Sequence, residues 1–326
     1  MTVARSVGPW LSLVARIAVA VGLTGYILWK SHPRAVLAAV AGADWRLISV
    51  AVLLVFIDRA LIAYRWIVLL CIIDPAQRPP LSAILRVFFV STFVGALLPS
   101  VGGDAVRAYS TAKLDVRGGD AAASVFMDRI LGVASILIIA LVGLLFAQDL
   151  ARNSWVVVSL AAAAGVCLLS LLLVFSGHTT RAASAVLTPL PGALQHAGDR
   201  ILESIRRYSA YRAHLANAVV CSIAVQVIRI LQAYFIGRGL AIEVGLTTYF
   251  GIVPLILLIV LLPVTFNGIG TSQAAFLWFF GRAGVTAAAA FALSVLFVAL
   301  GMVGNLPGGI LYAWGARGSQ RSGSLE

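Results

Sequence analysis

Long apolar runs set the first limit on what this chain can fold into. Six of them have about the 20 residues that a helix needs to cross ~30 Å of hydrocarbon. Charged residues make up only 11% of the chain, against about 25% in soluble domains. The sequence therefore predicts an all-α, polytopic membrane protein. The predicted spans are residues 8–29, 46–73, 120–147, 154–176, 214–237 and 286–314.

Two further apolar runs, residues 81–98 and 246–262, end in similar sequences that break a helix. Each reaches Leu-Leu-Pro, continues to glycines and restarts with polar side chains. In lipid, irregular backbone survives only where protein buries it or where it lines a wet cavity. Because the break occurs in both halves, it predicts two re-entrant helical hairpins in inverted repeats, with a substrate site between them. Eight full spans are the alternative.

The repeats divide the chain into residues 1–150, with a re-entrant segment at 81–110, and residues 151–316, with one at 246–280. A polar, disordered tail is expected at 317–326. If the N-terminus is inside, the inside loops carry more Lys and Arg than the outside loops. The positive-inside rule then places both termini in the cytoplasm. The net charge of +12 fits basic loops that contact anionic lipid, not nucleic acid.

Charged residues inside the predicted spans are candidates for function. Each arginine there costs ~2.5–3.5 kcal/mol near a helix centre, so it normally faces a partner or a cavity. Asp58-Arg59 and Asp128-Arg129 occur in near-identical contexts. Because neighbours on a helix project about 100° apart, we expect each aspartate to pair with an arginine from another helix. The intramembrane arginines are Arg16, Arg59, Arg65, Arg129 and Arg229, of which Arg16 and Arg65 lie near enough to helix ends to reach the interface.

These charges have two readings. They could be structural ion pairs that fix helix packing, or they could line a polar cavity for a lipid headgroup, with an aspartate able to carry a proton. Gln226, Arg229 and Gln232 form a polar stripe on an otherwise apolar helix. The stripe favours a wet groove, although a lone Gln also joins helices in membranes.

The two breaks have the chemistry of an anion site. Gly102 and Gly103 allow close approach, Asp104 can cap the restarting helix, and Arg107 lies one turn on. Helix N-termini of this kind bind phosphate. In the second half, hydroxyl and amide donors replace the charges. The alternative is ordinary hairpin chemistry at a loop. The second set is Gly268, Gly270, Ser272 and Gln273.

These motifs resemble a known family, the lysylphosphatidylglycerol synthase transmembrane region, which is the flippase-like domain of the multiple peptide resistance factor. The resemblance covers most of residues 10–315. It implies lipid translocation between leaflets of the bacterial inner membrane. The matching residues are Leu98-Pro99 through Gly102-Gly103-Asp104 and Arg107, Asp128-Arg129 with Gly132, and Pro263 through Asn267-Gly268-Ile269-Gly270.

The resemblance leaves the cargo open among a phospholipid, a glycolipid, a polyprenyl-linked lipid and a hopanoid. After Asn-Gly-x-Gly the family often carries an Arg-Glu pair, where this chain has Ser272-Gln273. That departure argues against an aminoacylated phosphatidylglycerol cargo. The aminoacyltransferase domain is not in this sequence, so we do not expect this chain to synthesise such an aminoacylated lipid.

We therefore expect a lipid flippase or transporter, not an enzyme, with no metal and no cofactor. The chain has no phosphate-binding Gly-x-x-x-x-Gly-Lys-Ser/Thr motif for ATP. Two other functions stay open: a membrane-embedded lipid-modifying enzyme with Asp104 and Asp128 as acid and base, and a non-transporting partner subunit of a lipid or glycan synthase. The expected substrate-binding residues are Asp58, Arg59, Pro99, Gly102, Gly103, Asp104, Arg107, Asp128, Arg129, Gln226, Arg229, Asn267, Gly268, Gly270, Ser272 and Gln273.

Overall fold

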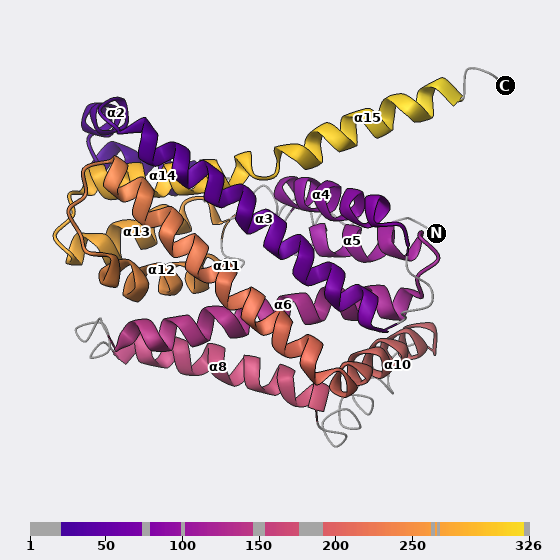
Figure 1. Ribbon diagram of the computed structural model, residues 1–326. Coiled ribbons are helices and arrows are strands. Elements are labelled where there is room, and N and C mark those ends of the chain that lie inside the picture. Colours follow the sequence, from indigo (N-terminus) through magenta and orange to yellow (C-terminus); the bar gives the residue numbers. More distant parts are fainter. Residues whose placement is uncertain are drawn as a thin grey trace, which may run out of the picture.

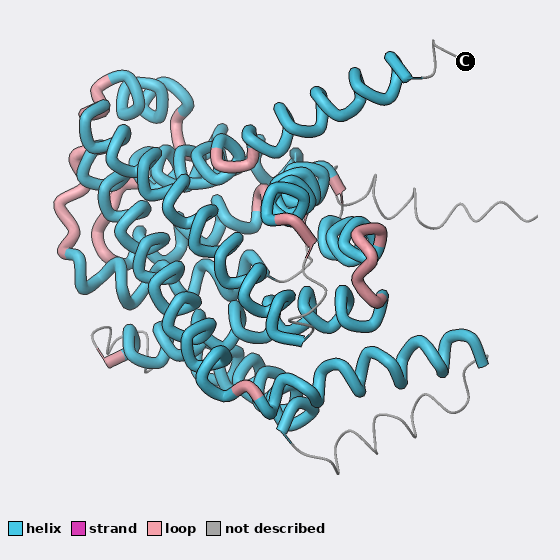
Figure 2. The backbone as a smooth tube through the Cα atoms, turned by 45° about the vertical axis from the view of Figure 1, so that its right-hand side comes forward, coloured by secondary structure: helices cyan, strands magenta, loops and turns pink. Residues whose placement is uncertain are grey.

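The computed structural model describes residues 21–73, 79–98, 102–145, 154–175, 192–261, 265 and 268–322. Helices make up nearly all of these residues, and no strand occurs among them (Figures 1 and 2). In chain order the helices are α2 (Pro33–Ala41), α3 (Trp45–Ile73), α4 (Leu81–Leu97), α5 (Gly102–Ala112), α6 (Gly118–Leu144), α8 (Ser154–Phe175), α10 (Gly192–Arg207), the 3-10 turn η1 (Tyr208–Ala210), α11 (Arg212–Gly239), α12 (Leu246–Leu261), α13 (Thr271–Arg282), α14 (Ala287–Val303) and α15 (Leu306–Ser322).

Four stretches are long and apolar enough to cross a membrane, and all four coincide with predicted spans. The chain is therefore an all-α polytopic membrane protein, as its composition predicts. The predicted span 154–176 is the 22-residue helix α8. Only the second part of the predicted span 8–29 falls in the described residues, where residues 21–30 are helical. The four stretches are Trp45–Ile72, Gly118–Leu144, Arg212–Gly239 and Ala287–Trp314.

The last of these stretches contains a bend that the sequence analysis does not predict. α14 ends at Val303, and α15 begins at Leu306 and packs along α4 (Figure 1). α15 stays helical to Ser322, so residues 317–322 differ from the disordered tail expected from Arg317. Once packing has nucleated a helix, each added residue gains a hydrogen bond, which explains the longer helix.

Both Leu-Leu-Pro breaks separate the arms of a helical hairpin. α4 pairs with α5 in the first half, and α12 pairs with α13 in the second. The first arms have 17 and 16 residues. At 1.5 Å per residue each is about 25 Å long, less than the ~30 Å thickness of the hydrocarbon core.

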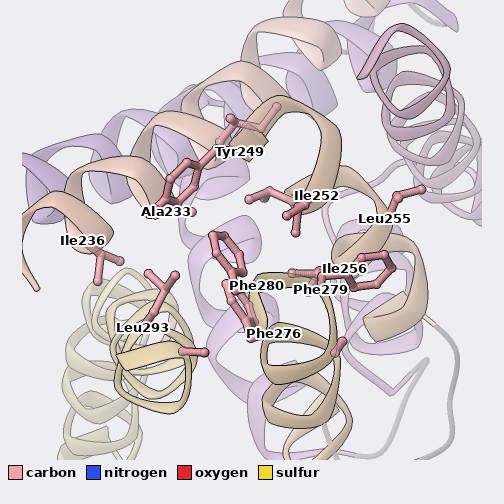
Figure 3. Close-up of a cluster of buried hydrophobic side chains, with 14 of the residues drawn as sticks. Ala233, Ile236, Tyr249, Ile252, Leu255, Ile256, Phe276, Phe279, Phe280 and Leu293 are labelled. Carbon is pink, nitrogen blue, oxygen red and sulfur yellow. The ribbon is translucent and has the colours of Figure 1, made fainter. Parts of the chain in front are cut away.

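The second hairpin lies in the main apolar core (Figure 3). The Tyr249 ring of α12 meets Phe280 of α13 edge-on, with centroids 5.0 Å apart. Phe276 and Phe280 stack one turn apart on the same helix. Ala233 and Ile236 of α11 and Leu293 of α14 contribute to the same cluster. Aromatic packing therefore fixes the position of this hairpin.

A glycine from the opposite half of the chain contacts the first arm of each hairpin. A Cβ on Gly143 of α6 would lie 2.2 Å from the carbonyl oxygen of Phe250 in α12. A Cβ on Gly308 of α15 would lie 2.0 Å from the carbonyl oxygen of Phe89 in α4. Only glycine allows backbones to approach this closely. The last helices of the two halves thus pack reciprocally against the hairpins.

Candidate functional site

A cavity of about 220 Å³ lies where the first hairpin meets α3, α6 and α11. These helices contribute most of its wall, and Leu261 at the end of α12 completes it. Five arginines line it, together with only one carboxylate. The lining residues are Arg59, Ile62, Arg65, Phe88, Thr92, Arg107, Asp128, Arg129, Gly132, Val133, Ile136, Val225, Gln226, Arg229 and Leu261.

We call the five arginines that line the cavity the arginine cluster. Each belongs to an ion pair, and three aspartates supply all the partner carboxylates. Five guanidinium groups against three carboxylates leave a surplus of two positive charges around the cavity. Because a buried charge is costly unless it is paired, this surplus of positive charge is the chemical feature of the cavity that needs explaining. The cluster is Arg59, Arg65, Arg107, Arg129 and Arg229.

Asp128 of α6 binds two arginines from two other helices. Arg65 of α3 donates from Nε to Oδ1 at 2.7 Å, and Arg107 of α5 approaches Oδ2 at 3.5 Å. Arg65 also donates to the hydroxyl of Ser222 at 2.9 Å. This confirms the expected pairing between helices for Asp128. Arg65 is only 5% exposed, so the expectation that it reaches the interface is wrong.

Arg107 owes its position to the first hairpin. A Cβ on Gly103 would lie 2.6 Å from the Cα of Gly95, so the two arms touch backbone to backbone there. One turn further along α5, Arg107 donates to the hydroxyls of Ser91 and Thr92 on α4, both at 3.2 Å. The local sequence thus holds one face of this guanidinium against its own hairpin.

Aromatic rings surround the same guanidinium. Its Cζ lies 4.8 Å from the ring centroid of Phe88 and 5.3 Å from that of Trp66. Cation–π contacts at such distances are worth about 0.5–2 kcal/mol, more when water is excluded. Arg107 is therefore held in place by its hairpin and by these rings, and it lines the cavity.

Asp58 of α3 also binds two arginines. It accepts hydrogen bonds from its neighbour Arg59 and from Arg229 of α11, both at 2.9 Å. The expectation of a partner from another helix is thus met by Arg229. Asp58 also pairs with the adjacent Arg59, although the two side chains leave the helix about 100° apart, because the arginine side chain is long enough to reach the carboxylate. Arg59 also donates to the carbonyl oxygen of Gly301 at 3.0 Å.

The third carboxylate lies at the start of the second arm of the first hairpin. Asp104 accepts two hydrogen bonds from Arg129 of α6, at 2.6 and 2.9 Å. The Arg129 side chain is 55% exposed, whereas the carboxylates in the cluster are buried. Arg129 is therefore the most accessible member of the arginine cluster.

Gln226 of α11 adds a neutral polar group to the cavity. Its amide nitrogen donates to the hydroxyl of Ser135 at 3.1 Å, and Ser135 donates in turn to the carbonyl oxygen of Gly132 at 2.8 Å. The amide oxygen of Gln226 has no hydrogen-bond partner among the described residues. Gln226 and Arg229, two members of the predicted stripe, both line the cavity, whereas the third, Gln232, does not.

The residues of the second break form hydrogen bonds with one another. Gly268 and Gly270 have φ values of 73° and 87°, which favour glycine. The amide oxygen of Gln273 accepts from the Gly270 N–H at 2.6 Å and from the Ser272 hydroxyl at 3.0 Å, so Gln273 caps its own helix. Gly270, Ser272 and Gln273 therefore bond to one another, and none of the four predicted site residues of this break lines the cavity.

Several other predicted site residues lie beside the cavity without lining it. Asp58 and Asp104 form ion pairs with arginines that line the cavity. Gly102 and Gly103 begin the helix that carries Arg107. Pro99 and Asn267 fall outside the described residues. Ser91, Thr92 and Phe88 could not be predicted as site residues, because hydroxyls and one aromatic ring within an apolar run give no signal of their own.

Metal ligation has no counterpart in this geometry. Across the described ranges, no three His, Cys, Asp or Glu side chains come together as metal ligands would. The chemistry that the site offers is instead that of fixed guanidinium donors, hydroxyls and one amide in a small, partly buried space.

Comparison with family models gives one match, to the lysylphosphatidylglycerol synthase TM region, over residues 13–308. This chain belongs to that family. The match includes every residue that lines the cavity and both hairpins. Neither the comparison with curated proteins nor that with solved structures gives a match. The family places the chain among membrane proteins with a lipid-related function.

Proposed function

We propose that this member of the lysylphosphatidylglycerol synthase TM family moves lipids with a polar, anionic headgroup between membrane leaflets. The observation that carries the proposal is the surplus of two positive charges around a cavity among membrane helices. Fixed guanidinium groups bind phosphate oxygens strongly, because their hydrogen bonds are charge-assisted. Intramembrane charges of this kind commonly mark a substrate pathway.

The size of the cavity decides how much of a lipid it takes. Its volume of about 220 Å³ is below the roughly 300–1,000 Å³ of pockets that enclose drug-sized ligands. A headgroup fits such a space, whereas acyl chains do not. The chains then stay in the bilayer while the headgroup passes through the protein.

Two features support alternating access between inverted repeats. The short first arms of both hairpins favour re-entrant segments over full spans. The reciprocal contacts, Gly143 with Phe250 and Gly308 with Phe89, are those expected of two halves related by a two-fold axis. The headgroup site would then be exposed to each leaflet in turn as the halves rock.

Placement of the termini in the cytoplasm of a bacterial inner membrane is part of the same proposal. Two basic segments predicted to be inside meet at one end of the molecule, where α10 packs against the start of α6 (Figure 1). Arg117 and Arg207 there both pair with Asp120. Exposed arginines such as Arg200 and Arg206 are available to anionic lipid at that end.

Transport explains the site better than either alternative. A lipid-modifying enzyme with Asp104 and Asp128 as acid and base needs a carboxylate free to exchange protons, and both carboxylates are held by guanidinium groups. A partner subunit without transport predicts that the buried charges pair off completely. Asp58 and Asp128 each pair with two arginines instead, so the buried positive charges exceed the negative ones.

A lipid-transfer assay in reconstituted vesicles tests the proposal. Arg229→Gln removes one cavity charge, while Asp58 keeps Arg59 as a partner, so the fold should survive. We expect transfer of an anionic fluorescent lipid to fall at least tenfold, since a charge-assisted hydrogen bond contributes about 1.5–3 kcal/mol.

Arg117→Gln is the matched control. It also removes one of two arginines from a buried aspartate, because Asp120 keeps Arg207, but it lies outside the cavity. We expect transfer by this variant to equal that of the wild type. Equal transfer by Arg229→Gln and Arg117→Gln, at equal amounts of folded protein, would contradict the proposal.

A further inference from the structure

The surplus charge around the cavity comes from two groups of ion pairs. Two aspartates each serve two arginines, so each of these groups carries a net charge of +1. The pair of Asp104 and Arg129 is neutral. An occupant that balances all the charges around the cavity therefore brings two negative charges. The two charged groups are Asp128 with Arg65 and Arg107, and Asp58 with Arg59 and Arg229.

Arg229 of α11 offers accessible donors to such an occupant. It donates from Nε to Asp58 at 2.9 Å, and neither of its terminal nitrogens has a hydrogen-bond partner among the described residues. The buried unpartnered atoms in this part of the chain include Nε of Arg59 but neither terminal nitrogen of Arg229. Both nitrogens are therefore accessible, in a residue that lines the cavity.

Arg129 of α6 offers a further donor from another helix of the wall. Nε and one terminal nitrogen donate to Asp104, so the second terminal nitrogen has no partner in the described ranges. Arg129 and Arg229 are the two most exposed side chains of the arginine cluster. Arg59, by contrast, donates from both terminal nitrogens to protein oxygens. Donors for an occupant are thus available from two helices, and guanidinium groups bind phosphate oxygens well.

Phosphate headgroups differ in charge and in the number of oxygens that accept hydrogen bonds. A phosphodiester carries one negative charge and has two non-bridging oxygens. A phosphomonoester carries close to two charges at pH 7 and has three such oxygens. Of the two, the phosphomonoester balances the surplus and accepts from more guanidinium groups at once. The volume of about 220 Å³ also favours a compact dianion.

We propose that the cargo is a lipid whose headgroup ends in a phosphomonoester, bound as the dianion by the arginine cluster. This inference rests on the proposed function and deepens it by naming the cargo class. The class excludes phosphodiester lipids such as phosphatidylglycerol and phosphatidylethanolamine as the preferred cargo.

Two lipids with identical acyl chains separate these chemistries. Phosphatidic acid is a phosphomonoester, and phosphatidylmethanol differs from it by one methyl group that removes one negative charge. Binding to the purified full chain in detergent is measured by native mass spectrometry in competition. We expect phosphatidic acid to bind about tenfold more tightly at pH 8, as one additional charge-assisted contact implies.

The preference should depend on pH, because the second ionisation of a phosphomonoester has a pKa of about 6. At pH 5 both lipids carry one charge, so the affinity ratio should fall toward one. The charged groups around the phosphate are the arginine cluster and its partners Asp58, Asp104 and Asp128, and no histidine of the described residues lines the cavity. Phosphatidylmethanol keeps its single charge at both pH values, so its binding reports any titration of these protein groups separately.

Arg229→Gln assigns the preference to the charge of the cavity. It lowers the surplus from two positive charges to one, so the ratio at pH 8 should fall toward one. Arg117→Gln is the matched control, because it also takes one of two arginines from a buried aspartate but lies outside the cavity. It should keep the tenfold ratio. Because the readout is a ratio, a loss of folded protein does not mimic the effect.

Leu261→Glu lowers the surplus without removing an arginine. Leu261 lines the cavity at the end of α12 and is 43% exposed, so a carboxylate there stays in contact with solvent. The ratio should again fall toward one. Leu97→Glu is its control, because Leu97 ends the first arm of the other hairpin, is exposed and does not line the cavity. An equal loss of preference in the two leucine variants overturns the inference.

A soluble pair, methyl phosphate and dimethyl phosphate, distinguishes a lipid from a free phosphate ester. Preference for phosphatidic acid supports the inference, whereas preference confined to the soluble pair overturns the lipid assignment. Equal binding of the two lipids at pH 8 overturns it too, as does a ratio that is the same at pH 5, or a full ratio in Arg229→Gln. Transport without this preference refutes only the inference, and preference without transport refutes only the proposed function.

Discussion

The guanidinium of Arg129 donates two hydrogen bonds to the carboxylate of Asp104, and this pair ties α6 to the first turn of α5. Because Arg129 is half exposed, solvent weakens the pair, although its two-pronged geometry is favourable. We expect a coupling free energy of about 1 kcal/mol between Asp104→Asn and Arg129→Gln in a double-mutant cycle of thermal stability in detergent.

Combining Asp104→Asn with Arg282→Gln supplies the control for that cycle. Arg282 lies at the end of the second hairpin, over the ring of Trp278, and has no part in the cavity. The two effects should add. Additive effects for the Asp104 and Arg129 variants as well would show that the pair contributes nothing to stability.

Gly103→Ala should loosen the first hairpin. The new Cβ would lie 2.6 Å from the Cα of Gly95 and 3.1 Å from the carbonyl oxygen of Ser91, so the arms must separate. We expect the free energy of unfolding to fall by about 1–3 kcal/mol, the usual cost of overpacking. Gly281→Ala, with no atom near its new Cβ, should instead raise stability by up to about 1 kcal/mol. Thermal unfolding in detergent checks both, and a neutral Gly103→Ala would disprove the close contact.

Gly237→Ala tests the contact that fixes the second hairpin to α11. A Cβ there would lie 1.9 Å from the hydroxyl oxygen of Tyr249. The buried Tyr249 hydroxyl has no partner among the described residues, so Tyr249→Phe alone should change stability little. We expect Gly237→Ala to destabilise the protein and Tyr249→Phe to rescue part of that loss. Full loss in the double variant would place the clash elsewhere.

Tyr208, outside the membrane-spanning helices, should make stability depend on pH in the alkaline range. Burial raises the pKa of its hydroxyl well above the ordinary value, and the nearby carboxylate of Asp120 adds to the effect. The hydroxyl donates to the carbonyl oxygen of Leu69 at 2.9 Å. Because the folded-state pKa exceeds the unfolded value of about 10, the contribution is complete below that pH and is lost as the pH rises above it.

The measurement is the difference in melting temperature between the wild type and Tyr208→Phe, followed from pH 8 upward. The wild type should lose more stability than the variant once the pH passes about 10. Parallel pH profiles would show that Tyr208 is not the responsible group.

The sequence predicts much of the fold because lipid leaves few options. Helix-length apolar runs gave α3, α6 and α11, and Leu-Leu-Pro followed by glycines gave both hairpins. The turn between α14 and α15 was missed although Gly304, Asn305 and Pro307 interrupt the apolar run there. These residues favour a turn, and α15 packs on α4 after it.

The site was predictable only where charge made it conspicuous. Arg59, Asp128 and Arg229 were found because an ionised side chain in an apolar helix needs a reason. Ser272 and Gln273 were predicted with equal weight, yet they bond to each other and to Gly270. From sequence alone, a polar side chain that caps its own helix looks the same as one that faces a ligand.

Sharing of carboxylates has a consequence for how such a site can change over generations. Asp128 serves Arg65 and Arg107 together, and Asp58 serves Arg59 and Arg229. Loss of either aspartate leaves two arginines without a carboxylate partner, whereas loss of one of these four arginines leaves its aspartate with the other. Substitutions are therefore tolerated at these four arginines more readily than at the two aspartates. Descendants of this chain can then change which cargo they accept by replacing an arginine while both aspartates are retained.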